Sequence, residues 1–417
     1  MDAKRPVRAG LLLLSLMVPC AAQAQPPAAS VASEQAPTPT PSPRRAQQQA
    51  AMAERAARNR AEVDALIRRT EQQSNPTAER VSQWLAEQQR TASERAAQRR
   101  EALKKALVDG PELDMREALT EQAKAWFAAR DFAALDRSYD GYTQRSERTP
   151  SGLWKSGFIS VGAERALGPA QNDEQFQRAD ASLQQWLSAR PDSTLAHLLR
   201  ARLMVQRAWA YRGDGYAASV EQANWRPFFD GLRRTQEYLE AHKPVASASP
   251  EYYSLTITVL KGLQKSPFPT FDEGLERFPG YYPMYFSMLD YLLPKWHGST
   301  EQIEHFASEA VARTQQAEGR GMYARIYWYA AQSQFHDKLF LQSKANWERM
   351  RAGFDDVIAR YPDQWNLQNY ASFACDANDE ETLKKLFERI SEPSLDEAWR
   401  SHERYVACGR RAGKLKN

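Results

Sequence analysis

Beyond about Met115, apolar residues recur every three to four positions in segments that end at short breaks containing Pro or Gly. This spacing places apolar side chains on one face of an amphipathic helix. At three breaks we expect one helix to end just before a proline and the next to begin just after it, because proline cannot continue a helix but suits a first turn. These breaks are Ala189-Arg190-Pro191-Asp192, Arg277-Phe278-Pro279-Gly280 and Ala359-Arg360-Tyr361-Pro362-Asp363.

The breaks divide residues 115–417 into helices that can pair as hairpins. The spacing predicts single helices over 131–142 and 395–408, and five pairs: 176–187 with 193–211, 225–241 with 251–263, 283–292 with 300–314, 323–335 with 347–360, and 366–375 with 380–390. Consecutive amphipathic helix pairs joined by short turns are typical of tetratricopeptide-like repeats. We therefore expect an all-α, helical-hairpin repeat solenoid over residues 115–417.

The segment before this region has a different pattern. Residues 44–109 are rich in Ala, Gln, Glu and Arg, and they predict a long charged helical arm that is broken near Asn75-Pro76. The apolar residues of the arm form three sparse groups that would share one helix face: Val63, Leu66 and Ile67; Val81, Trp84 and Leu85; and Leu103 and Leu107. Such a thin stripe falls short of a strong coiled coil. We expect a solvated spacer helix, with weak self-association through residues 44–108 as the alternative.

Two further segments precede the arm. Residues 1–24 combine a basic start, an apolar run over 11–18 and small residues ending at Ala24, which is the pattern of a secretory signal peptide. Cys20 is an alternative lipid acceptor, but Pro19 fits a lipoprotein signal poorly. Residues 25–43 contain six prolines and predict a disordered tether. We expect a periplasmic or secreted protein whose mature chain has no transmembrane segment, because no later apolar run approaches about 20 residues.

Composition and net charge limit the fold classes and the types of partner that this sequence allows. Val and Ile together number only 21 of 417 residues, which disfavours a large sheet core. The formal net charge is only +4, so we expect no nucleic-acid partner. The arm from Arg44 to Val108 carries 14 basic against 8 acidic residues, whereas the region after it is slightly acidic.

Three segments of the sequence carry a resemblance to a known protein family. They are Trp209-Ala210-Tyr211-Arg212-Gly213-Asp214-Gly215-Tyr216, Leu293-Pro294-Lys295-Trp296-His297-Gly298-Ser299 followed by His305-Phe306-Ala307, and Asn369-Tyr370-Ala371-Ser372-Phe373-Ala374-Cys375. Together they resemble the bacterial family of unknown function numbered 4034, a helical, tetratricopeptide-like group often found behind signal peptides. The resemblance covers roughly residues 115–400. It implies the helical fold and no particular chemistry. Gly213 or Gly215 suits the left-handed end of a helix, and Ser299 suits the cap of the next one.

The sequence matches no strong catalytic motif, and we expect no catalytic residues and no cofactor. His297 and His305 lie eight residues apart with Glu301 and Glu304 between them. Glu301 and His305 would share a helix face, but a metal site needs three or four convergent ligands, so we expect ordinary surface pairing and no metal. The tripeptide Arg212-Gly213-Asp214 is interpreted as a turn, not as an adhesion motif.

Aromatic residues supply the candidate binding surface. Tyr281-Tyr282 and Trp328-Tyr329 are consecutive pairs, and neighbouring residues on a helix cannot all face one core. One member of each pair would therefore line another helix or a concave, peptide-binding face. Packing between the helices is the alternative explanation.

Two cysteines remain after removal of the expected signal peptide, namely Cys375 and Cys408. An even count in an oxidising compartment is compatible with a disulfide that fastens the last helix. The alternative is a pair of small, buried apolar residues.

We expect an exported helical-repeat protein that binds another protein or an envelope component without covalent chemistry. One alternative is a hydrolase that acts on envelope glycans through carboxylates of the solenoid. Another is a structural spacer, which would be favoured if the aromatic pairs prove to be buried. A deep pocket with two unpaired acids would favour the hydrolase.

Overall fold

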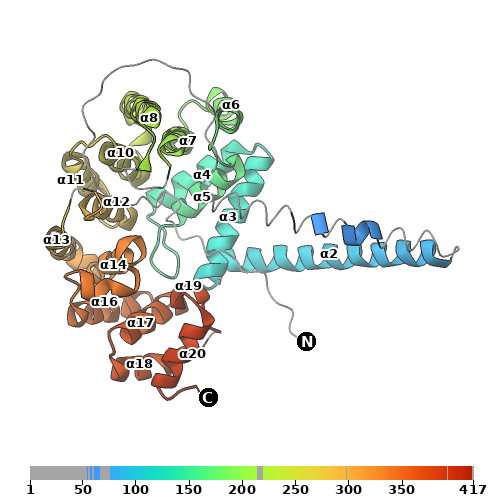
Figure 1. Ribbon diagram of the computed structural model, residues 1–417. Coiled ribbons are helices and arrows are strands. Elements are labelled where there is room, and N and C mark those ends of the chain that lie inside the picture. The colour runs from blue at the N-terminus through green and yellow to red at the C-terminus, as the bar shows by residue number, and fades with distance from the viewer. Residues whose placement is uncertain are drawn as a thin grey trace. The chain divides into compact units, whose positions relative to one another are not determined.

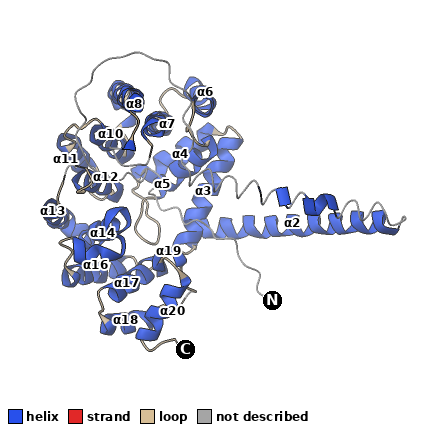
Figure 2. Ribbon diagram, in the orientation of Figure 1, coloured by secondary structure: helices blue, strands red, loops and turns tan. Residues whose placement is uncertain are grey.

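The computed structural model describes residues 54, 57–58, 61–65, 76–213, 219–296, 298–391 and 393–415. Within these ranges the regular structure is helical and contains no strand, apart from one isolated bridge between Arg148 and Trp154 (Figure 2). The predicted all-α class is therefore confirmed. The expected signal peptide (1–24), with Cys20, and the tether (25–43) lie outside the described residues. By its contacts the chain divides into two units, one comprising residues 26–105 and the other containing residues 106–417.

Helix α2 (Pro76–Asp109) forms most of the described arm and begins at the proline where the sequence predicts a break. Trp84 in α2 and Val63 in the helical stretch 61–65 are each 55% exposed. Charged side chains pair locally along α2, as Arg90 does with Glu87 at 2.6 Å. An exposed helix with short-range ion pairs fits the expected solvated spacer. Self-association through residues 44–108 stays a prediction.

The unit containing residues 106–417, here called the body, consists of helices joined by short connections (Figure 1). These helices are α3 (Glu112–Ala128), α4 (Phe132–Gln144), α5 (Lys155–Leu167), α6 (Asp173–Ala189), α7 (Thr194–Arg212), α8 (Gln222–Ala241), α9 (Lys243–Ala246), α10 (Pro250–Gly262), α11 (Phe268–Arg277), α12 (Tyr282–Leu292), α13 (Thr300–Glu318), α14 (Gly321–Ala330), α15 (Leu339–Gln342), α16 (Trp347–Arg360), α17 (Gln364–Asp376), α18 (Glu380–Phe387), α19 (Asp396–Trp399) and α20 (His402–Arg411).

The body helices form an inner and an outer layer. The inner helices α10 and α14 are buried along their whole length, whereas the outer helices α6, α11 and α18 each bury only three residues. Inner helices pack against one another in series, α5 with α7, α7 with α10, α10 with α12 and α12 with α14. All five expected helix pairs are in contact. This order is consistent with the predicted helical-hairpin repeat.

The three proline breaks behave as the sequence predicts. The preceding helices end at Ala189, Arg277 and Arg360. In two of the breaks the proline carbonyl also accepts a hydrogen bond from a side chain six residues later: Pro191 from Nε2 of His197 at 2.8 Å, and Pro279 from the Tyr285 hydroxyl at 2.9 Å. These two breaks therefore fix the start of the next helix through a side chain as well as through the proline ring.

The prediction of a single helix over 395–408 is wrong. It is divided into α19 and α20 by Arg400, which adopts a left-handed conformation with φ of 69°. Trp399, just before this bend, is fully buried and packs against Phe387 and Tyr405 at 5.5 and 5.4 Å between ring centroids. Burial of this indole accompanies the break in the helix, so tertiary packing overrides the local helical pattern.

Candidate functional site

The segment 146–154, between α4 and α5, runs into the middle of the body (Figure 1). Ser151 at its tip is only 1% exposed, and its carbonyl oxygen accepts hydrogen bonds from Arg325 of α14 at 2.9 Å and from Asn366 of α17 at 3.2 Å. Trp154 donates from Nε1 to the carbonyl oxygen of Gly280 at 3.2 Å. The chain's own segment therefore occupies the interior that an open solenoid would offer to a partner.

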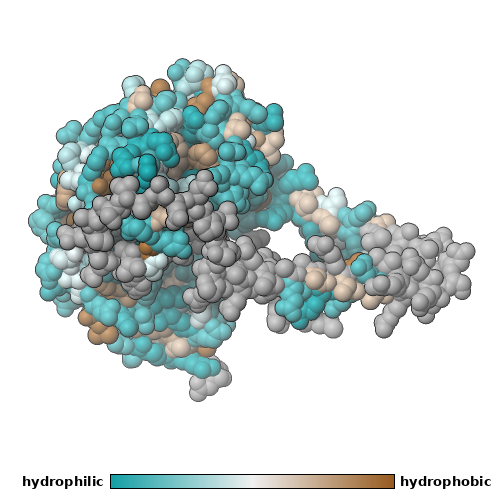
Figure 3. Space-filling view, turned by 45° about the horizontal axis from the view of Figure 1, so that its top comes forward, coloured by the Kyte–Doolittle hydropathy of each residue, from teal (hydrophilic) through white to brown (hydrophobic). Residues whose placement is uncertain are grey.

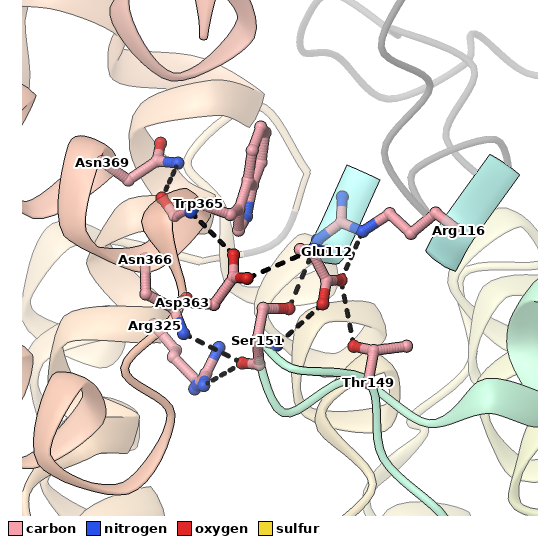
Figure 4. Close-up of polar contacts among 9 residues, drawn as sticks. All are labelled: Glu112, Arg116, Thr149, Ser151, Arg325, Asp363, Trp365, Asn366 and Asn369. Carbon is pink, nitrogen blue, oxygen red and sulfur yellow. Dashed lines mark hydrogen bonds and ion pairs between the residues drawn. The ribbon is translucent and has the colours of Figure 1, made fainter. Parts of the chain in front are cut away.

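A polar cluster surrounds this segment and joins the beginning of the body to its end. Figure 4 shows its residues, here called the closure cluster: Glu112, Arg116, Thr149, Ser151, Arg325, Asp363, Trp365, Asn366 and Asn369. The backbone N–H of Glu112 in α3 donates to Oδ2 of Asp363, at the start of α17, at 3.2 Å. The Arg116 guanidinium lies over the Trp365 ring, 4.7 Å from its centroid. Helices α3 and α17 are thus in direct contact although they are far apart in the sequence.

The carboxylates of the closure cluster are fully engaged within the chain. Oε1 of Glu112 accepts from Nε of Arg116 at 2.5 Å and from the Thr149 hydroxyl at 3.0 Å, while Oε2 accepts from the N–H of Ser151 at 2.7 Å. Burial raises the pKa of Asp363, whose Oδ1 caps α17 through the N–H of Trp365. The cluster holds parts of the chain together and presents no free acid or base.

The four candidate binding aromatics do not form an exposed face. Tyr281, Tyr282, Trp328 and Tyr329 are 3%, 0%, 7% and 3% exposed. The ring of Tyr281 meets Trp154 edge-on at 5.3 Å, and Arg148 lies over Tyr282 at 4.9 Å. In this structure segment 146–154 therefore covers the first pair, and the consecutive rings pack against different parts of the same core.

An open pocket lies instead where α7, α8 and α9 meet the end of α6. It has a volume of about 350 Å³ and is lined by the polar side chains of His197, Arg200, Tyr238 and His242. The remaining lining residues are apolar: Leu187, Pro191, Ala241, Pro244 and Val245. A mostly apolar concavity with a few polar groups is the usual composition of a binding site, and this volume is at the small end of the range.

The local sequence explains how these side chains are positioned. Ser193 caps α7 by accepting from the N–H of Ala196, so His197 lies in the first turn. Tyr238 and His242 are four residues apart at the end of α8, which places them on one face. The ring of His242 lies close to both others, with its centroid 4.3 Å from that of His197 and 4.1 Å from that of Tyr238.

Hydrogen bonds fix the proton positions in this group. The Pro191 carbonyl can only accept, so Nε2 of His197 carries a proton, and Nδ1 then accepts from the Tyr238 hydroxyl at 2.7 Å. Burial lowers the pKa of His197, which favours this neutral form. His242 donates from Nδ1 to the backbone carbonyl of Tyr238 at 2.8 Å, at the end of α8. Its Nε2 is turned away from that carbonyl, and none of the described residues bonds to it.

The charges next to the pocket are paired. Nε of Arg200 binds Oδ1 of Asp180 at 2.7 Å, and its guanidinium lies 5.3 Å from the centre of the Tyr238 ring. Lys243, which follows His242, pairs with Glu273 at 2.8 Å. The pocket is therefore close to neutral when its imidazoles are neutral, and Nε2 of His242 is an acceptor without a partner among the described residues.

The histidine and acid group considered from the sequence does not converge. His305 is 77% exposed at its side chain and lies 3.5 Å from Glu309, and Glu301 pairs with Lys344. Glu304 accepts hydrogen bonds from the hydroxyls of Tyr323 and Tyr327. His297 lies outside the described residues. Among the residues that the structure describes, no group of three or more His, Cys, Asp or Glu side chains could hold a metal ion.

Cys375 of α17 and Cys408 of α20 are joined by a disulfide, with an S–S distance of 2.04 Å. Both are almost fully buried. This bond fastens the last helix, α20, to α17.

The sequence did not indicate the pocket, because its residues come from four different helices and the turns between them. His197 and His242 are 45 positions apart, and neither belongs to a known motif. One signal was present in the sequence: Pro191 belongs to a proline break that was recognised, and His197 follows it by two helical turns at most.

On the face shown in Figure 3 the described surface is mostly hydrophilic, with apolar residues scattered in small groups. No helix in the described ranges is both long and apolar enough to cross a membrane. Single exposed apolar residues are normal on protein surfaces and by themselves indicate no partner.

The comparison with family models supports part of the resemblance noted in the sequence. A model described as "Domain of unknown function (DUF4034)" matches residues 119–228, from within α3 into α8. Of the three segments that carry the resemblance, only Trp209–Tyr216 lies inside this match. Gly213 ends α7 with a positive φ of 72°, and Ser299 caps α13, as the sequence predicts. No curated protein and no solved structure matches the chain. Residues 119–228 of this chain are thus similar to the DUF4034 family model, which names no activity.

Proposed function

We propose that this is an exported helical protein that binds another protein without covalent chemistry, through the open pocket between α7, α8 and α9. The observation that carries the proposal is the pocket itself, where apolar walls surround rings that are held in place by hydrogen bonds. Rings fixed in this way lose little conformational freedom when a partner binds. The signal-like N-terminus and the Cys375–Cys408 disulfide support the proposed location in the periplasm or outside the cell.

A structural spacer is the second candidate, and the burial of Tyr281, Tyr282, Trp328 and Tyr329 favours it. A spacer needs no pocket with an accessible polar atom, so the function of the pocket decides between the two. The glycan hydrolase has less support, because buried acids such as Glu112, Glu251 and Asp290 each face a buried cation.

A site-specific crosslink in cells tests the proposal. A photo-crosslinking amino acid is introduced at Ala241, which is exposed at the rim of the pocket, and separately at Gln302, which is exposed on α13. We expect a defined crosslinked protein species from position 241 and none of the same species from position 302.

Filling the pocket provides the matched control. Val245→Trp, combined with the probe at position 241, should remove the species while far-ultraviolet circular dichroism stays helical. If positions 241 and 302 give the same products, or if the folded Val245→Trp protein still forms the species, the protein does not bind a partner through this pocket.

A further inference from the structure

Among the imidazole nitrogens of the pocket between α7, α8 and α9, one has no partner among the described residues, and that atom bears on which ligands fit. The Tyr238 hydroxyl is committed to His197, and both ring nitrogens of His197 are engaged. His242 is held by Nδ1 against the end of α8, so its Nε2 is the remaining group. A neutral imidazole that carries its proton on Nδ1 is an acceptor at Nε2.

The surroundings of this acceptor disfavour charged ligands. The Arg200 guanidinium is engaged by Asp180, and Lys243 is engaged by Glu273, so an anion would lack a free cation. A ligand cation would meet Arg200 and Lys243 without an unpaired carboxylate among the lining residues. Transferring an unpaired charge into such a place costs more than transferring a neutral ring.

Size and wall chemistry select the shape of the ligand. A volume of about 350 Å³ is at the lower limit for drug-sized molecules and suits a single ring. The walls combine aliphatic side chains with the rings of His197, Tyr238 and His242, which pack against one another, and such a lining favours an aromatic ligand.

We propose that this pocket binds an uncharged aromatic ring bearing one O–H or N–H donor, which is the chemistry of a tyrosine or tryptophan side chain of the partner protein. The inference rests on the proposed function and specifies its contact. The ring enters between the aliphatic wall and the stacked imidazoles, and its donor binds Nε2 of His242. Tyrosine and tryptophan have this combination of an apolar body and a donor tip, and they are common anchors of protein interfaces.

The test uses the full-length mature protein at pH 8, where an ordinary imidazole is neutral, and three small probes followed by NMR titration. The probes are 4-methylphenol, its methyl ether 4-methylanisole, and 4-methylbenzoate. We expect 4-methylphenol to bind about three- to tenfold more tightly than 4-methylanisole, the factor that one neutral hydrogen bond supplies. We expect 4-methylbenzoate to bind more weakly than either.

Two variants separate the hydrogen bond from the ring. His242→Phe keeps an aromatic face and removes the acceptor, so the preference for the phenol over its ether should disappear. His305→Phe, an exposed position on α13, should leave the preference unchanged. Equal binding of phenol and ether to the unmodified protein, a preference retained in His242→Phe, or tighter binding of 4-methylbenzoate would each overturn the inference.

The outcomes are distinguishable from those of the proposed function. If the crosslink at position 241 forms and depends on the pocket, but 4-methylphenol shows no preference, the partner binds there by other chemistry and only this inference fails. If the phenol binds as expected but no crosslinked species forms in cells, the pocket accepts a free aromatic molecule and the protein-binding function fails.

Discussion

The closure cluster and the pocket between α7, α8 and α9 are built from similar side chains and differ in what they leave free. Both combine aromatic rings with an arginine–carboxylate pair, Arg116 with Glu112 in one and Arg200 with Asp180 in the other. In the closure cluster the two atoms without a partner, Nε of Arg325 and Oδ1 of Asn366, are fully buried. In the pocket, His242, whose Nε2 has no partner among the described residues, lines an open cavity.

The difference shows that aromatic and charged composition alone does not distinguish a cluster that stabilises the fold from a binding site. What matters is whether a polar group is satisfied within the chain or can be reached from outside. The closure cluster should therefore control stability with little influence on ligands, and the pocket should do the reverse.

The largest expected effect is on the closure cluster. Glu112→Ala leaves the buried Arg116 guanidinium without its carboxylate and removes the acceptor of the Ser151 N–H. We expect the free energy of unfolding to fall by about 3–5 kcal/mol, measured by urea denaturation followed by circular dichroism.

The matched control lies in the same helix. Glu121 is partly exposed and pairs with Lys124 at 2.8 Å. Its replacement by alanine should lower the free energy of unfolding by less than about 1 kcal/mol. Equal effects of the two substitutions would show that the closure cluster does not support the fold.

The next effect concerns the disulfide, which fastens α20 to the helix that carries Trp365 and Asn366 of the closure cluster. Replacing Cys375 and Cys408 with alanine opens a loop of 33 residues and should cost about 3 kcal/mol. Hydrogen exchange should speed up in α17–α20 and stay unchanged around His197 and Tyr238. Two titratable thiols in the native protein would contradict the disulfide. Faster exchange in the pocket would contradict the separation of the two regions.

The smallest effect is the pH response of the pocket. Burial lowers the pKa of His197 below its ordinary value of 6.5, so the unfolded chain takes up a proton at a higher pH than the folded one. Stability therefore falls as the pH drops below 6.5 and levels off once the folded pKa is passed. His197→Gln, which does not titrate, should show a shallower fall between pH 7 and 5.5 in thermal unfolding. Parallel curves for the two proteins would mean that His197 is not held neutral by the fold.

The helical class and most helix boundaries could be predicted, because they depend on local chemistry. Proline lacks the N–H that continues a helix, and the helix ends at Ala189, Arg277 and Arg360, each just before a proline, follow from that property. The split at Arg400 could not be predicted, since it accompanies the burial of Trp399, whose indole N–H donates to Gln368 of α17, 31 residues earlier.

Helix α5 was also missed, for a physical reason that lies in its glycines. A Cβ on Gly162 would lie 2.4 Å from the carbonyl oxygen of Thr120, so the glycine allows α3 and α5 to pack closely. Glycine is a poor helix former, so Gly162 contributes to the structure through this close helix contact and not by favouring the helix itself. The sequence indicated that the two members of each aromatic pair face different surroundings, but it did not reveal that Trp154 of segment 146–154 packs against Tyr281.

The hydrogen bond from Glu112 to Asp363 joins positions 251 residues apart. An open stack of repeats can nucleate anywhere and can fray from either end, because each unit contacts only its neighbours. Here the first helix of the body finds its partner only after most of the chain has been synthesised. We therefore expect slow, all-or-none assembly of this unit, with a premature stop before α17 leaving Glu112 and Arg116 without their late partners.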